Sequence, residues 1–237
     1  MPSSRSAFEV RRIRRARDGL VQYESDRLLV TVGQPGAGIM GEYSLSVTCL
    51  SDLMSVGNFA ATSRAHVVVS GPDWDRVRRY VNALVASCPK VASREAHELF
   101  LRYFEPVDNC GREGAGRTHG KVRVRGFDPP WFQSVDRNDL HLSFGVVEGR
   151  SLVDTELTVD VVTPAGLQQR AQNERFVLSH RATIIMPAID LSWVHDHVVR
   201  LVEDACAAPD IASAMPLLQR YFRTPWEDSL SRNLDML

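Results

Sequence analysis

Two stretches of the chain, Tyr43-Ser44-Leu45-Ser46-Val47 and Leu157-Thr158-Val159-Asp160-Val161, alternate apolar and polar residues. Such alternation is typical of a strand with one side in a core and the other in water. Leu53 follows the first stretch at the same distance at which Leu167 follows the second. We therefore expect the chain to contain one structural unit twice.

The correspondence extends outward from these strands, and the spacing changes only where loops are expected. Further pairs are Trp74 with Trp193, Pro89 with Pro209, and Arg102-Tyr103-Phe104 with Arg220-Tyr221-Phe222. Self-similarity on this scale predicts a repeated domain. The two copies are predicted over residues 1–108 and 121–237, and the four glycines in residues 109–120 indicate a linker between them.

Within each copy the pattern predicts four strands and then two helices. The strands are expected at 8–10, 28–32, 43–47 and 66–69 in the first copy and at 122–124, 140–144, 157–161 and 183–186 in the second. Asp73, Ser93 and Ser192 are the expected N-caps of helices. The predicted fold class is α+β, with two tandem copies of a domain that has an antiparallel sheet of about four strands followed by two helices packed on one face.

The composition is that of an ordinary globular protein, with 44% hydrophobic and 24% charged residues and a formal net charge of −1. Apolar runs such as Val67-Val68-Val69 are far shorter than the roughly 20 residues that a membrane helix needs. The four cysteines (Cys49, Cys88, Cys110 and Cys206) lie far apart, which is typical of reduced thiols. We therefore expect a cytoplasmic protein without a membrane partner.

Two glycine-rich stretches have the spacing of phosphate-binding loops, but neither has the required setting. Gly36 to Gly41 matches GxGxxG, yet a strand is predicted after it, where a dinucleotide site needs a helix. Gly111 to Thr118 lacks a preceding apolar strand and has Arg117 in place of the usual lysine. We interpret the first stretch as a hairpin loop and the second as part of the linker, and we expect no cofactor.

Metal-binding and catalytic patterns are not found either. In His195-Asp196-His197 the two imidazoles are two residues apart, so on a helix they diverge instead of facing one ion. No serine lies in a GxSxG elbow, and no cysteine has an activating neighbour in the sequence. The sequence thus predicts no metal site and no catalytic residues.

Two kinds of surface cluster point to partners. Five arginines lie between Arg11 and Arg17, but no aromatic residue is interleaved with them, so we do not expect nucleic acid as the partner. Aromatic residues beside acidic ones are typical of protein interfaces. The residues predicted on this basis to contact a protein partner are Trp131, Phe132, Asp136, Trp226, Glu227 and Asp228.

Several motifs resemble those of the immunity protein 8 family of bacterial polymorphic toxin systems, with the chain taken as two domains. One motif is a strand that runs into Thr163-Pro164 before Leu167. Another is a helix start at Asp73-Trp74 whose apolar spacing runs to Ser87-Cys88. The third is the aromatic and acidic tail Trp226-Glu227-Asp228. Together the motifs extend over nearly the whole chain.

The resemblance implies a non-catalytic immunity protein that binds and neutralises a cognate toxin domain encoded nearby. Such proteins cover a toxin's active site, often with acidic side chains. Residues 111–237 contain 14 basic and 17 acidic residues, so the second copy is the better candidate face. We expect a monomer with an internal pseudo-twofold axis or a weak dimer. The alternative is an enzyme or small-ligand-binding protein with a site at the seam between the copies, where pockets often form.

Overall fold

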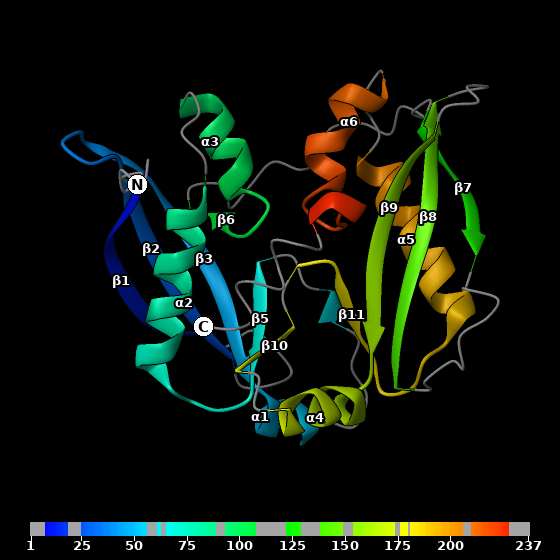
Figure 1. Cartoon of the computed structure of the whole chain (residues 1–237), viewed down its shortest axis with the longest axis horizontal. Helices are drawn as coiled ribbons and strands as arrows, with labels where there is room; N and C mark the ends of the chain where they lie inside the picture. The colour runs from blue at the N-terminus through cyan, green and yellow to red at the C-terminus, as the bar shows by residue number, and fades with distance from the viewer. Residues whose placement is uncertain are drawn as a thin grey trace, which may run out of the picture.

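The computed structural model has an α+β fold with one sheet in each half of the chain (Figure 1). It describes residues 8–18, 25–55, 61–62, 65–88, 93–107, 122–128, 138–148, 154–173, 176–179, 181–205 and 210–227. The first half contains β1 (Glu9–Asp18), β2 (Ser25–Gly33), β3 (Ile39–Cys49), α1 (Leu50–Met54), β4 (Ala61–Thr62), β5 (His66–Val69), α2 (Trp74–Ser87), α3 (Ser93–Phe100) and β6 (Glu105–Pro106). The second half contains β7 (Val122–Asp128), β8 (Asp139–Glu148), β9 (Asp154–Val162), α4 (Pro164–Gln172), β10 (Val177–Ser179), β11 (Thr183–Ile185), α5 (Leu191–Ala205), α6 (Ile211–Leu218) and the short helix η1 (Pro225–Glu227).

The predicted strands overlap β1, β2, β3 and β5 in the first half and β7, β8, β9 and β11 in the second. The first three strands of each half pair in antiparallel fashion, as predicted. The fourth strand differs, because β5 runs parallel to β3 and β11 runs parallel to β9. The prediction of an antiparallel sheet was therefore wrong at this strand. The chain crosses over through a helix, α1 or α4, before the fourth strand, and such a crossover allows parallel pairing.

The two halves exchange edge strands. β4 of the first half pairs with β11 of the second, with Thr62 opposite Ile184. In return, β10 of the second half pairs with β5 of the first, with Val177 opposite Val69. The strand orders are therefore β1-β2-β3-β5-β10, with β6 added on β3, and β4-β11-β9-β8-β7. Each sheet thus contains one strand that belongs to the other half of the chain.

Apolar residues form one core in each half and a third between them. Val81 of α2 and Phe100 of α3 pack with Leu45 of the first sheet, and α5 and α6 form the equivalent core on the second. The third core consists of Leu50, Leu53, Val68, Val162, Leu167, Leu178 and Ile185. It lies where α1 and α4 meet, below the exchanged strands (Figure 1). The halves are therefore joined by apolar packing as well as by strand pairing.

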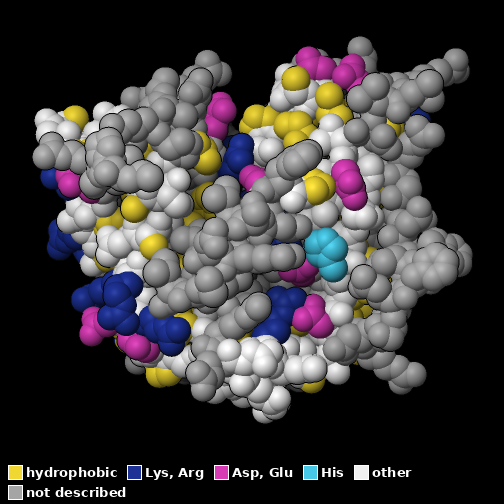
Figure 2. Space-filling view, in the orientation of Figure 1, with side chains coloured by type: hydrophobic (Ala, Val, Ile, Leu, Met, Phe, Trp, Pro, Cys, Tyr) yellow, Lys and Arg dark blue, Asp and Glu magenta, His cyan; other side chains and the backbone are white. Residues whose placement is uncertain are grey.

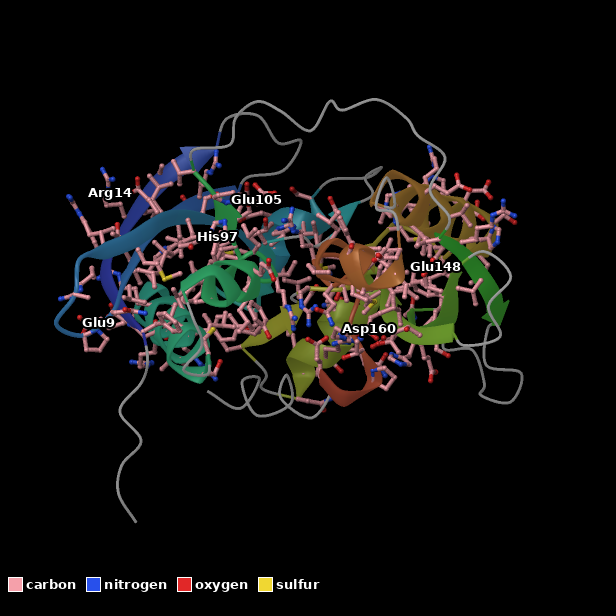
Figure 3. All side chains as sticks on the ribbon, turned by 90° about the horizontal axis from the view of Figure 1, so that it is seen from above. Glu9, Arg14, His97, Glu105, Glu148 and Asp160 are labelled. Carbon is pink, nitrogen blue, oxygen red and sulfur yellow. The ribbon has the colours of Figure 1, made fainter. Side chains whose placement is uncertain are left out.

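The helices α2 and α5 lie on opposite sides of the molecule. α2 lies in front of its sheet in Figure 1, whereas α5 lies behind β8 and β9, and Figure 3 shows the same arrangement from above. The two long helices thus cover opposite sides of their sheets (Figure 1). The sheet faces turned away from α2 and α5 consequently point to opposite sides.

Helix α2 begins where the sequence predicts. The carboxylate of Asp73 accepts a hydrogen bond from the amide of Arg76 at 3.0 Å and so caps the helix in front of Trp74. Helix α3 begins at Ser93, one residue earlier than a helix capped by Ser93 would begin.

Helix α5 begins earlier than predicted, at Leu191. The carboxylate of Asp190 accepts hydrogen bonds from the amides of Ser192 and Trp193, at 3.0 and 3.1 Å. The N-cap is therefore Asp190, and the prediction of Ser192 was wrong because Ser192 already lies inside the first turn. An Asp side chain thus starts the long helix in both halves.

Both halves hold the chain in the same unusual conformation just before the fourth strand. Ala65 and Ala182 have φ values of 50° and 60°, in a region that residues other than glycine rarely adopt. The carbonyl of Ala65 accepts a hydrogen bond from the amide of Ser46 at 2.8 Å, and that of Ala182 accepts one from the amide of Asp160 at 2.9 Å. Matched hydrogen bonds to the third strand therefore fix both turns.

The stretch from Gly36 to Gly41 forms the predicted hairpin. Residues 34–38 turn between β2 and β3, and Gly36 has a φ of 77°, which favours glycine. Strand β3 begins at Ile39, so this loop leads into a strand and not into a phosphate-binding helix.

The second glycine-rich stretch and the predicted linker 109–120 lie outside the described residues, as do Cys110 and Cys206. Cys49 and Cys88 are free thiols. Among the helices that the structure describes, none combines the length and the apolar character needed to cross a membrane.

His66 makes the stability of the fold depend on pH. Its side chain is buried in β5, with Nε2 2.8 Å from Oγ1 of Thr48, and burial lowers the pKa of His66 to about 4. Because the ordinary value is about 6.5, the neutral imidazole stabilises the fold above that pH, and this contribution is lost as the pH falls towards 4. We expect roughly 2–3 kcal/mol of unfolding free energy to be lost between pH 7 and pH 4.5 through this residue.

Urea unfolding at both pH values measures this loss, with His66→Gln as the comparison. The amide retains a partner for Thr48 but does not titrate, so the variant should lose less stability than the wild type on acidification. Equal losses in the two proteins would show that His66 is not responsible.

Candidate functional site

The structure describes two of the six predicted contact residues. Trp131, Phe132, Asp136 and Asp228 lie outside the described residues, and of Trp226 only the backbone is described, within η1. Glu227 ends η1 and has a described side chain. Its contacts define the first part of the candidate site.

The carboxylate of Glu227 joins the two halves of the chain. Oε1 accepts a hydrogen bond from Nη1 of Arg102 at 2.8 Å, and Oε2 accepts one from Nη2 of Arg181 at 3.1 Å. The amide of Thr224 also donates to Oε2, at 3.0 Å. Burial alone would raise the pKa of Glu227, but the two guanidinium groups and this amide hold it below its usual value. At 16% exposure, this side chain is an internal ion-pair partner.

Arg181 is the most buried charge beside Glu227, with a side chain only 4% exposed. Its Nη1 donates hydrogen bonds to the carbonyl of Phe222, at 2.8 Å, and to the carbonyl of Gln219. Both carbonyls follow α6, and the partial negative charge at a helix C-terminus favours a cation there. The guanidinium also lies over the ring of Tyr103, 5.3 Å from its centre. Arg102, Tyr103, Arg181 and Glu227 are named the seam cluster below.

Only part of the seam cluster has a signal in the sequence. Arg102 and Tyr103 belong to the Arg-Tyr-Phe tripeptide that recurs in the second half. No motif marks Arg181 as a partner of Glu227. The seam between the halves, which is the alternative ligand site expected from the sequence, thus contains a carboxylate of the chain itself between two arginines.

A second group of charged side chains lies on the face of the second sheet turned away from α5. Nδ1 of His141 on β8 is 2.8 Å from Oδ1 of Asp160 on β9, and Nη2 of Arg223 donates to Oδ2 of Asp160 at 2.7 Å. Backbone hydrogen bonds between Thr158 and Arg223, at 2.7 and 3.0 Å, hold Arg223 beside β9. His141, Asp160 and Arg223 are named the polar row.

The polar row combines a buried anion with an exposed imidazole. Burial alone would raise the pKa of Asp160, but the hydrogen bond from His141 and the charge of Arg223 hold it below its usual value. The side chain of His141 is 50% exposed, whereas those of Asp160 and Arg223 are 14% exposed. The row therefore presents the imidazole of His141 to solvent, and the ion pair between Asp160 and Arg223 holds this imidazole in place.

The seam cluster and the polar row lie on neighbouring segments. Arg223 of the row and Glu227 of the cluster are both in the segment after α6, and this segment contacts β9 through η1. Figure 3 shows Asp160 beside this C-terminal segment. A histidine side chain beside acidic and basic ones is visible on the same half in Figure 2. The arrangement offers hydrogen-bonding and ionic contacts to a partner that approaches this face.

The residues of His195-Asp196-His197 turn to different neighbours. Nδ1 of His195 is 3.2 Å from Oδ1 of Asp196, whereas the ring of His197 stacks on Trp193, with their centres 4.7 Å apart. Among the described residues, no group of three or more His, Cys, Asp or Glu side chains is arranged to hold a metal ion.

The arginines between Arg11 and Arg17 lie along β1, and three of them pair with acidic side chains of the same sheet. The pairs are Arg11 with Glu9 at 2.6 Å, Arg14 with Glu42 at 2.7 Å and Arg15 with Asp26 at 2.6 Å. These carboxylates offset much of the positive charge that a phosphate backbone would otherwise attract.

Comparisons of the chain with models of protein families, with characterised proteins and with solved structures gave no significant match.

Proposed function

We propose that this chain is a non-catalytic immunity protein that binds and neutralises a cognate polymorphic toxin, encoded nearby, in the cytoplasm of the producing cell. The motifs that resemble the immunity protein 8 family support this function. In the structure these motifs shape the backbone, because Thr163 accepts a hydrogen bond from the amide of Gly166 at 3.1 Å and caps α4, as Asp73 caps α2. A rigid framework of this kind lowers the entropy cost of binding.

We also propose that the two halves, 1–108 and 121–237, are copies of one domain. The shared order of elements and the matched conformations of Ala65 and Ala182 support this origin. The exchanged strands support it as well, since β4 gives the second sheet what β10 gives the first. Reciprocal contacts of this type are those of a symmetric dimer, so one chain would act as a monomer with an internal pseudo-twofold axis.

The polar row beside η1 is the observation that carries the proposed binding face. Its groups are fixed by one another, and preformed hydrogen-bonding groups are what a tight and specific partner requires. We assign direct toxin contacts to His141 of the row and to the predicted residues Trp131, Phe132, Asp136, Trp226 and Asp228. Glu227 holds η1 in position on this face through its ion pairs with Arg102 and Arg181.

The proposal is tested by producing the chain together with the C-terminal domain of the protein encoded next to it. We expect a one-to-one complex on size-exclusion chromatography with light scattering, and loss of the neighbour's toxicity. A toxic neighbour that neither binds nor is neutralised would contradict the proposed function.

The binding face is tested with His141→Ala combined with Glu156→Lys. Glu156 is exposed on β9 and alternates with Asp160, so it shares the face of the polar row. We expect the affinity for the toxin, measured by calorimetry, to fall by at least about tenfold. The control is Glu203→Lys, which makes the same charge change at an exposed position of α5 on the opposite side. Equal effects of the two charge changes would contradict this face.

The seam cluster favours a second candidate function, a small-ligand-binding protein or enzyme with a site at the seam. Two guanidinium groups and Tyr103 around one carboxylate would also suit a carboxylate ligand in place of Glu227. In that case Glu227→Ala should gain thermal stability from added acetate, with the wild type unaffected. For the immunity function, Glu227 is needed only inside the fold.

A further inference from the structure

A pocket of about 220 Å³ opens in the first half, away from the polar row. It is lined by Ile13 of β1, Leu28 of β2 and Trp74 of α2, with the cationic side chains of Arg15 and Arg78 beside them. Apolar walls with a few placed charges are the usual makeup of small-ligand sites. Figure 2 shows basic side chains gathered over this half, at the left.

Arg15 is held in place before any ligand arrives. Its Nη2 lies 2.6 Å from Oδ2 of Asp26, and its guanidinium lies over the ring of Trp74, 4.0 Å from the ring centre. Both contacts restrict the side chain, so little rotamer freedom remains to be lost on binding. The indole and the guanidinium together form a preformed wall of the pocket.

The pocket carries a surplus of positive charge. Asp26 offsets the charge of Arg15, whereas Arg78 has no ion pair with any described residue. A guanidinium beside an apolar cavity attracts a carboxylate, sulfonate or phosphate group, which it can bind through two parallel hydrogen bonds. The surplus therefore selects an anion.

The fold itself does not demand these residues. The capping residues Asp73 and Asp190 occupy the same place in the two halves, so Trp74 corresponds to Leu191 and Arg78 corresponds to His195. The pairing of Trp74 with Trp193 expected from the sequence is therefore displaced by two residues. The second half builds the same helix without an indole or a guanidinium at these positions. The combination in the first half is thus specific to that half.

We propose that this pocket binds a small organic anion with a flat, apolar body and a single charged group. The body packs against the wall formed by Trp74 and Arg15 and fills the space over Ile13 and Leu28, while the charged group pairs with Arg78. Arg15 keeps its ion pair with Asp26 and serves as the rigid side of the pocket. This site is independent of the proposed toxin-binding face.

The test uses anilinonaphthalene sulfonate, an aromatic anion whose fluorescence rises on apolar binding, and benzoate as a competitor, both with the full chain. We expect saturable one-site binding and displacement by benzoate. Arg78→Gln should weaken binding by about tenfold or more, since a charged hydrogen bond is lost. Trp74→Leu, which installs the residue of the second half, should weaken it similarly.

The matched control is Arg79→Gln, which removes the same charge from an exposed neighbour on α2 outside the pocket. This variant should bind within about twofold of the wild type. Circular dichroism and thermal unfolding confirm that each variant is folded. Equal losses in the Arg78 and Arg79 variants, or binding that does not saturate, would overturn the proposal. So would binding of an oligonucleotide in preference to benzoate, because it would assign the charge to a polyanion.

Discussion

Of the glycine-to-alanine substitutions at the described glycines for which the contacts of an added Cβ are known, Gly166→Ala is expected to destabilise the fold most. Gly166 is buried in the first turn of α4, and an added Cβ would lie 2.1 Å from the carbonyl oxygen of Asn138 and 2.9 Å from Cγ2 of Val162. The Asn138 carbonyl cannot move aside freely, because it accepts a hydrogen bond from the amide of Thr163 at 2.9 Å. We expect a loss of about 3 kcal/mol or more in the free energy of unfolding.

Urea unfolding followed by circular dichroism measures this loss. The control is Gly38→Ala in the exposed hairpin between β2 and β3, where an added Cβ meets nothing within 4 Å. This control should change the stability by less than about 0.5 kcal/mol. Similar stabilities of the two variants would contradict a close contact between Gly166 of α4 and the carbonyl of Asn138.

Glu227→Gln is expected to have the second large effect. The amide keeps the shape of the side chain but removes the charge between Arg102 and Arg181. Among the described residues, Arg181 is then left buried without a counterion. Breaking a buried ion pair by removing one partner costs about 3–5 kcal/mol. Since the pair joins the two halves, the loss should lower the temperature at which the whole chain unfolds.

The pH dependence of Glu227 distinguishes the ion pair from mere packing. Its folded-state pKa is lowered, so the carboxylate stabilises the fold above its ordinary pKa, and this contribution is lost as the pH falls through the folded value. Glu227→Gln should therefore be least harmful in acid. The control is Glu42→Gln, whose partner Arg14 is about half exposed, and its cost should stay below about 1 kcal/mol. Equal costs in both variants would contradict the buried pair.

Local features of the fold could be predicted from the sequence because they depend on near neighbours. The alternation in Tyr43–Val47 and Leu157–Val161 identified two strands, and Asp73 identified the start of α2. Helix α4 was not predicted, since Pro164 and Gly166 are typical of a turn. In the structure Pro164 lies in the first turn, where proline is tolerated, and Gly166 is required by the close approach of Asn138.

Pairings between distant segments could not be predicted. Periodicity shows which side of a strand is buried but not which strand lies beside it, so the parallel β5 and the exchanged β4 and β10 carried no signal. The same limit applies to the candidate site. Glu227 was identified as an acidic residue beside an aromatic one, but Arg102 lies 125 residues away in the chain. Nothing local to Glu227 shows that its charge is already neutralised.

The exchanged strands make each half depend on the other for a complete sheet. β4 completes the sheet of the second half and β10 completes that of the first, so neither half carries all the strands of its own sheet. A gene that lost one half would also lose a strand from the other, and a half moved into another protein would arrive with an unpaired edge. Residues outside the exchanged strands differ between the halves, as Trp74 and Leu191 do. The exchanged strands, in contrast, cannot be removed from one half without exposing a sheet edge in the other.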